Sequence, residues 1–183
     1  MSGKEWGKMK RLLLLLAALL ALAAGTAGAE DLSAAYITGL SVSPAEVKSY
    51  GKVRIEVTFS DGAAEEHVFH AGDAMTVSWP GQGDAFLKGY KATIPLISPE
   101  GITYGTAEVG PSGVIIRFFD PVEDMYDVHG SFWLEAMAVN ETDTQEEDTK
   151  TLSVTGGQKT AEVAIHKGAS GAVAGGDTPD VRK

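Results

Sequence analysis

The chain has 183 residues, 44% of them hydrophobic, no cysteine and a formal net charge of −10 at pH 7. Without cysteine it cannot form disulfides, so an exported domain of this composition must be stabilised by its apolar core. The acidity, with no cluster of basic residues in the domain, argues against binding to nucleic acid or to anionic membranes.

The first 29 residues have the composition of a secretory signal peptide. Four basic residues between positions 4 and 11 precede an apolar run, and Ala27-Gly28-Ala29 supplies the small residues of a cleavage site. The apolar run has about 13 residues, whereas a membrane span needs about 20. We therefore predict cleavage after Ala29, an extracellular location at the cell surface or cell wall, and no membrane span after cleavage. Removing four basic and one acidic residue leaves 11 Lys and Arg against 24 Asp and Glu, a net charge of −13.

Alternation of apolar and polar residues dominates the segment 34–167, which has the length of one ordinary domain. The alternation is clearest in 53–59 and recurs in 75–79, 90–96 and 161–165. It predicts half-buried β-strands, and the proline at position 95 predicts an edge position for its strand. The only helix expected is one turn around residues 122–126.

Turn sequences rich in Gly, Pro and Asp separate the predicted strands. Their spacing predicts an all-β fold, a two-sheet antiparallel sandwich of about nine strands. After Lys167 the composition changes to Gly, Ala and polar residues without periodicity. Residues 168–183 are therefore predicted to be a flexible linker or tail.

The segment 114–119 interrupts the alternation, because it is apolar on both faces apart from Arg117. Such a pattern is typical of a central strand covered on both sides, or of one whose outer face meets a partner. The residues of the segment leave these two interpretations open.

The next strand, expected over 130–139, presents apolar side chains to both faces. Phe132 and Leu134 belong to the core-facing set, with Ala136 and Ala138. Trp133, Met137 and Val139 then point outward, and an exposed apolar group of this kind often marks a contact surface. We predict that these three residues bind a partner. The alternatives are a bulge that shifts the register and a loop that covers them.

Asp127, His129 and Ser131 have the side chains of a hydrolytic triad at alternate positions. On one strand, neighbours two residues apart are about 7 Å from each other. A triad needs hydrogen bonds of about 2.6–3.2 Å between nucleophile and base, so the histidine could not reach both partners. The sequence contains no Gly-x-Ser-x-Gly motif. We interpret the three residues as the solvated face of a strand, and no catalytic residue is predicted.

Two further polar groups contain residue types that can bind metals. His67 and His70, beside Glu65 and Glu66, have the H-x-x-H spacing of zinc ligands on a helix, but their flanks indicate strand and turn. The acidic run 141–148 lacks the spacing of a calcium-binding loop, so it is interpreted as a solvated loop. The sequence therefore predicts no metal and no cofactor.

Two stretches, "FHAGDAMTVSWP" (69–80) and "GVIIRFFDPVEDMYDVHGSFWLEAMA" (113–138), resemble the Ig-like ligand-binding region of Gram-positive cell-wall-anchored adhesins, the fibrinogen- and collagen-binding surface proteins. The first carries the family residues Ala71, Gly72, Asp73 and Pro80, and the second carries Phe118, Asp120, Val122, Glu123, Val128, Gly130, Ser131 and Phe132. The sequence departs from the family pattern at Arg117 and Phe119, which replace small hydroxyl residues, and at Pro121, which replaces an aromatic residue. The resemblance extends over about residues 36–167.

The resemblance implies an Ig-like sandwich. It also implies a non-catalytic adhesin module for a host matrix protein of the collagen or fibrinogen class. Family members bind ligand in a groove between two such domains, closed by a strand-like latch, so this domain is expected to be the first of a pair. The partner is then a matrix protein or an adjacent Ig-like domain, and no ligand-contacting residue is carried over. The alternative is an accessory carbohydrate-binding domain or a spacer domain of a larger secreted protein.

Overall fold

The computed structural model describes residues 31–62 and 67–169. The predicted signal peptide and most of the predicted tail lie outside the described residues. The elements in chain order are α2 (Ser33–Tyr36), β1 (Ile37–Ser43), β2 (Glu46–Lys48), β3 (Lys52–Ser60), β4 (Ala74–Ser78), β5 (Ala85–Gly89), β6 (Ala92–Ile97), β7 (Thr103–Gly110), β8 (Gly113–Phe118), the 3-10 helix η1 (Asp120–Asp124), β9 (His129–Asn140), β10 (Asp148–Gly156) and β11 (Lys159–Lys167).

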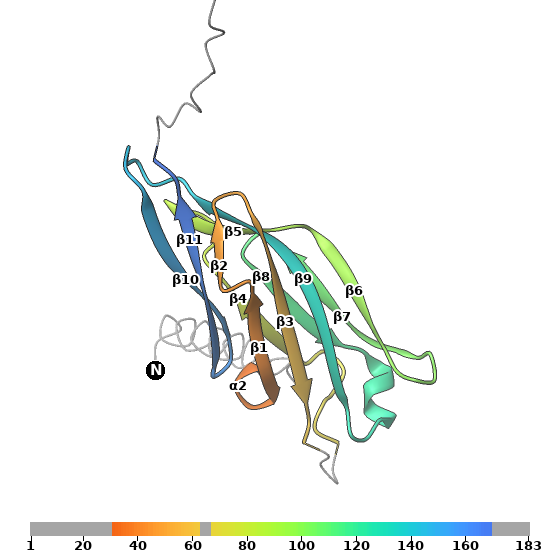
Figure 1. The fold of residues 1–183 in the computed structure, drawn as a ribbon. Helices are drawn as coiled ribbons and strands as arrows, with labels where there is room; N and C mark the ends of the chain where they lie inside the picture. Colours follow the sequence, from red (N-terminus) through yellow and green to blue (C-terminus); the bar gives the residue numbers. More distant parts are fainter. Residues whose placement is uncertain (1–30, 63–66, 170–183) are drawn as a thin grey trace, which may run out of the picture.

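The predicted all-β, Ig-like sandwich is confirmed: a four-stranded sheet in the order β1-β3-β9-β5 faces a seven-stranded sheet in the order β2-β11-β10-β4-β8-β7-β6 (Figure 1). The described residues form eleven strands rather than about nine. The difference arises from short strands such as β2, whose three residues are too few to show alternation. Most neighbouring strands are antiparallel, and β2 runs parallel to β11.

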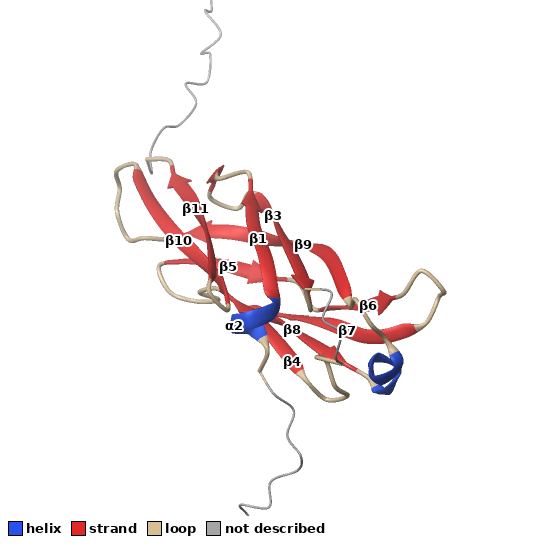
Figure 2. Ribbon diagram, turned by 90° about the horizontal axis from the view of Figure 1, so that it is seen from below, coloured by secondary structure: helices blue, strands red, loops and turns tan. Residues whose placement is uncertain are grey.

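The short helices α2 and η1 lie at the same end of the sandwich, opposite the end where the chain leaves β11 (Figures 1 and 2). η1 covers the first part of the turn expected around 122–126. No helix of the described residues is long and apolar enough to cross a membrane.

The core between the sheets is built from the inward faces that the alternation predicts. On β3, Val53, Ile55, Val57 and Phe59 are all buried. At the end of the sandwich near α2, Phe118 of β8 stacks on Phe69 with ring centroids 4.6 Å apart and meets Phe59 edge-on at 5.9 Å. This contact joins the two sheets through a loop residue.

The strand that begins after Tyr90 partly departs from the expectation. Pro95 lies on β6, the edge strand of the seven-stranded sheet, as predicted. Of the apolar set expected to face the core, only Leu96 is buried, while Tyr90 is exposed. The physical reason is that Tyr90 belongs to the crossing between the sheets, where β5 ends and β6 begins, so the strand alternation does not apply to it.

We predict that Phe118→Ala lowers the free energy of unfolding by about 3–5 kcal/mol, because it leaves a cavity among the stacked rings. The adjacent Phe119 is 39% exposed and supplies the control. Phe119→Ala is expected to change stability by less than about 1 kcal/mol. Urea unfolding of the two variants measures both values, and equal losses would contradict this account of the core.

Candidate functional site

Trp133 lies on the outer face of the four-stranded sheet and is 51% exposed. The guanidinium carbon of Arg54, on the neighbouring strand β3, lies 4.5 Å from the centre of the Trp133 ring. Lys52 pairs with Glu135 at 2.8 Å on the same face, and Met137 of β9 is partly exposed. The exposed apolar surface predicted from the sequence is thus present at Trp133 and continues in part at Met137.

Val139, the third residue of that prediction, is buried, with 1% of its surface exposed. The last residues of β9 pair with β5 on one edge, where Val139 faces Phe86. On the other edge, the amide of Tyr50 donates to the carbonyl of Ala138. The side chain of Asn140 reaches Ile165 in the other sheet. Because this end of β9 is enclosed, the outward face ends before Val139.

One edge of β9 is open over half its length. Strand β3 pairs with residues 129–137 of β9, whereas β5 pairs only with 136–140. In the described part of the chain, the remaining edge therefore has no strand partner. A hollow of about 630 Å³ lies beside it, lined by Trp133 and Leu134 of β9 and by Tyr90 and Ile94 from the crossing and β6.

Arg54 and Tyr90 belong to this surface, although the sequence pattern does not identify them. By sequence, Arg54 is one polar residue of an alternating strand, and only the pairing of β3 with β9 places it over Trp133. Tyr90 is the first residue of the alternation in 90–96, which predicts a strand there. The signal that could have identified it is its place directly after Gly89, where the alternation of β5 ends.

Asp127, His129 and Ser131 do not form a triad. Nδ1 of His129 lies 2.8 Å from the backbone carbonyl of Asp127 and 3.4 Å from its carboxylate. The side chains of both residues are more than 60% exposed. Ser131 lies opposite Thr58 of β3, and no hydrogen bond joins it to His129 among the described residues. The prediction that the imidazole does not reach both partners is confirmed.

His67 and His70 contact the segment around η1 instead of forming a joint metal site. Nδ1 of His70 lies 2.9 Å from a carboxylate oxygen of Glu123, whose other oxygen accepts the amide of Ala71 at 2.8 Å. The ring of His67 lies 4.1 Å from that of Tyr126. Among the described residues, no group of three or more His, Cys, Asp or Glu side chains could hold a metal ion. Glu65 and Glu66 lie outside the described residues.

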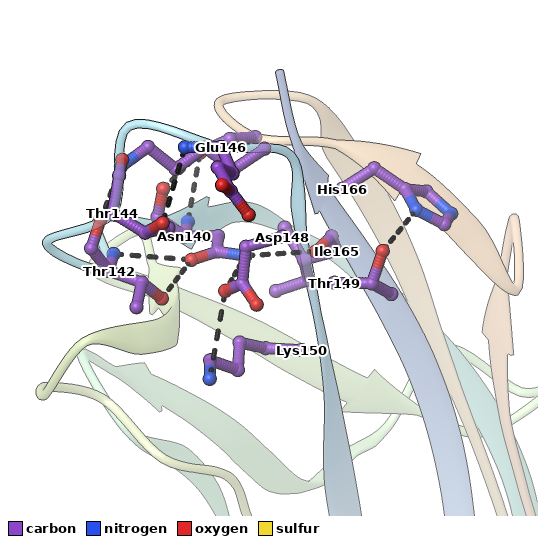
Figure 3. A network of polar contacts seen from close by, with 11 residues as sticks. Asn140, Thr142, Thr144, Glu146, Asp148, Thr149, Lys150, Ile165 and His166 are labelled. Atoms are coloured by element: carbon purple, nitrogen blue, oxygen red, sulfur yellow. Dashed lines mark hydrogen bonds and ion pairs between the residues drawn. The ribbon is translucent and has the colours of Figure 1, made fainter. Parts of the chain in front are cut away.

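The acidic run 141–148 is the loop between β9 and β10, and polar contacts hold it against the sandwich (Figure 3). The buried side chain of Asn140 accepts the amide and the hydroxyl of Thr142 and donates to Asp148 at 3.3 Å. The ammonium group of Lys167 donates to the carbonyl oxygens of Thr142 and Thr144. Asn140 thus joins the two ends of the loop, and Lys167 holds its first half.

Comparisons of the sequence and the fold with known proteins identify the class of protein to which this domain belongs. No protein-family model matches the sequence. The sequence is 35% identical over 143 residues to the collagen adhesin of Staphylococcus aureus, which covers 78% of this chain. The chain spans only 12% of that relative's length.

Solved structures give the same result for the fold. A crystal structure of S. aureus collagen adhesin matches with a TM-score of 0.69 and 32% identity, covering 81% of this chain and 47% of that one. The collagen-binding domain of Erysipelothrix rhusiopathiae surface protein RspB matches with a TM-score of 0.67 and 18% identity, covering 76% and 48%. The Enterococcus faecalis adhesin ACE matches with a TM-score of 0.55 and 17% identity, covering 76% and 46%.

The described domain is therefore an Ig-like domain of the kind found in the ligand-binding regions of Gram-positive surface adhesins. Within that class, one protein to which its sequence is similar is the S. aureus collagen adhesin. The resemblance stated from the two sequence stretches is confirmed.

We predict a pH-dependent contact between His70 and Glu123. The hydrogen bond to Glu123 raises the pKa of His70, and the Ala71 amide, followed by His70, lowers the pKa of Glu123. Because folding raises the pKa of His70, the protonated histidine stabilises the fold at low pH. This contribution is lost as the pH rises through the raised pKa. Because folding lowers the pKa of Glu123, its ionised carboxylate stabilises the fold at higher pH. This contribution is lost as the pH falls through the lowered pKa. The contact therefore stabilises most between these two pKa values.

The measurement is an NMR titration of the His70 imidazole in the wild-type protein and in Glu123→Gln. The pKa of His70 should fall in the variant, because the charged acceptor is gone. Asp73 also lies close enough to raise the pKa of His70, so part of the shift should survive. An unchanged His70 pKa would remove Glu123 as its cause.

We predict that Trp133→Ala changes the free energy of unfolding by no more than about 1 kcal/mol, since the ring lies on the outer face. Trp79 provides the contrast, because it is buried and its Nε1 donates to the carbonyl of Pro111 at 3.1 Å. Trp79→Ala should cost about 3–5 kcal/mol. Chemical denaturation of both variants tests this, and a loss of several kcal/mol for Trp133→Ala would place that residue in the core.

Proposed function

We propose that the chain is an exported, surface-displayed adhesin module that binds a matrix protein of the collagen or fibrinogen class without performing chemistry. The observation that carries the proposal is the 35% identity to a collagen adhesin over most of the described domain. The fold supports it, since the similar structures include the collagen-binding domain of RspB and the adhesin ACE, which binds its ligands by the collagen hug model.

The surface around Trp133 and Met137 and the open edge of β9 support a binding role of a definite kind. An extended segment can add to an open strand edge through backbone hydrogen bonds, with its side chains contacting the apolar groups nearby. The hollow beside this edge offers Tyr90, Ile94 and Trp133 for such contacts. The occupant that fits is a flexible segment, either of the ligand or of an adjacent Ig-like domain.

A carbohydrate-binding role is the second candidate, and one observation favours it. Tyr90 and Trp133 are exposed aromatic residues that line the same hollow, together with the polar groups of Lys52 and Glu135. Aromatic faces combined with a few polar groups are a common lining of small-molecule sites.

One binding experiment separates these functions. The protein is passed over immobilised collagen, immobilised fibrinogen and insoluble polysaccharide, with albumin as the inert control. We expect binding to collagen or fibrinogen. Where the ligand contributes a flexible segment that adds to the β9 edge, Trp133→Ala should reduce binding about tenfold. Binding to polysaccharide alone would replace the adhesin proposal by the carbohydrate one. Binding to none of these would favour a spacer.

A further inference from the structure

The outer face of the seven-stranded sheet carries a row of three exposed side chains that the sites above do not use. Ile115 and Arg117 point outward from β8, and Phe119 continues the row because its backbone is still extended, with φ −116° and ψ 168°. Ile115 is 37% and Phe119 39% exposed. Neighbours in the row are about 7 Å apart. The sequence left open whether this strand is covered or meets a partner, and the described structure leaves its outer face uncovered.

The surroundings of this row are shallow and contain small side chains. A hollow of about 600 Å³ borders Ile115 and includes Thr76, Ser78 and Gly113. A second, of about 490 Å³, borders Arg117 and Phe119. Both hollows adjoin β8, so the row of Ile115, Arg117 and Phe119 lies along them. An elongated partner can contact the row and the hollows together.

The charges on this face differ from those on the opposite face of the sandwich. There, Lys52 pairs with Glu135, and Arg54 contacts both Glu56 and the ring of Trp133. On the β8 face, no ion pair joins Arg117 to another described residue, although the chain as a whole is acidic. A cation between two apolar groups is complementary to a carboxylate flanked by apolar side chains.

The proposed function limits what can fill each surface. A collagen triple helix winds three polyproline-type chains around each other, so none of them is free to pair as a β-strand. A triple helix therefore cannot use the open edge of β9 and needs an exposed face. Its imino acid rings are suited to aromatic and aliphatic contacts, as in other polyproline recognition. Acidic side chains on its surface can meet Arg117.

We propose that the row of Ile115, Arg117 and Phe119 on β8 is a docking surface for a collagen-type triple helix bearing an exposed carboxylate. Phe119 and Ile115 contact imino acid rings, and Arg117 pairs with the carboxylate. Glu108 of β7, opposite Ile115, and Asp120, which lines the hollow beside Arg117 and Phe119, are acidic neighbours of the row and favour a basic residue of the ligand beside them. This inference rests on the proposed matrix-binding function and assigns the triple helix to a different face from the strand-accepting edge.

The test uses two immobilised triple-helical peptides, a Gly-Pro-Hyp host and the same host with glutamate at one exposed position. Arg117→Glu should weaken binding to the glutamate peptide by about tenfold or more and affect the host peptide less. The double variant I115T/F119T should weaken binding to both peptides by about tenfold. Arg117→Lys should keep most of the affinity. Lys48→Glu makes the same change of charge on β2, an edge strand of the same sheet separated from β8 by three strands, and should bind like the wild type.

The outcomes distinguish the two proposals. If the wild-type protein binds collagen and the β8 variants bind equally well, the docking surface is refuted while the proposed function stands. If the wild-type protein binds neither peptide nor collagen but binds fibrinogen, the docking surface is refuted and the proposed function stands. If it binds neither peptide, collagen nor fibrinogen, both fail. Sedimentation analysis is the second readout: a dimer that the double variant abolishes would make this face a contact between two copies, which also overturns the proposal.

Discussion

The stacking of Phe118 on Phe69, with Phe59 meeting both rings, is the contact on which the arrangement of the domain depends. Phe59 comes from the four-stranded sheet, Phe118 from the seven-stranded sheet, and Phe69 from the loop between β3 and β4. A chain without disulfides has no covalent link between its sheets, so buried aromatic surface has to supply the connection. Tyr36 and Tyr104 extend the ring cluster toward α2 and β7.

This contact also decides what β8 presents to solvent. Because neighbouring side chains of a strand point to opposite faces, a buried Phe118 forces Arg117 and Phe119 outward. The same rule on β9 turns Trp133 outward between the buried Phe132 and Leu134. The core thus determines the positions of the two outer surfaces. Their charges differ, since Lys52 and Arg54 have carboxylate partners on one face, whereas on the other no ion pair joins Arg117 to another described residue.

Much of the fold could be predicted from the sequence, because burial of alternate residues leaves a direct record in β3, β4 and β11. The pairing of the strands leaves no such record. The contact of Arg54 with Trp133 depends on the register between β3 and β9, and Val139 is buried where β5 and Tyr50 pair with the end of β9. Tyr90 shows a third limit of the sequence pattern. The alternation of apolar and polar residues includes Tyr90, although this residue lies in the crossing between β5 and β6 and not in a strand. For the same reason, the outward face predicted from the sequence is exposed at Trp133 but ends before Val139, and its role in binding a partner stays a prediction.

The two open features of the sandwich differ in the geometry of the partner they accept. An edge of β9 offers backbone donors and acceptors, so it selects a chain that can become extended, whatever its side chains. The outer face of β8 has its backbone paired on both sides with β4 and β7, and it can offer only side chains. It therefore selects by shape and charge and can accept a rigid rod. Because the edge and the face belong to different sheets, a strand and a rod can be bound at the same time without competing for one surface.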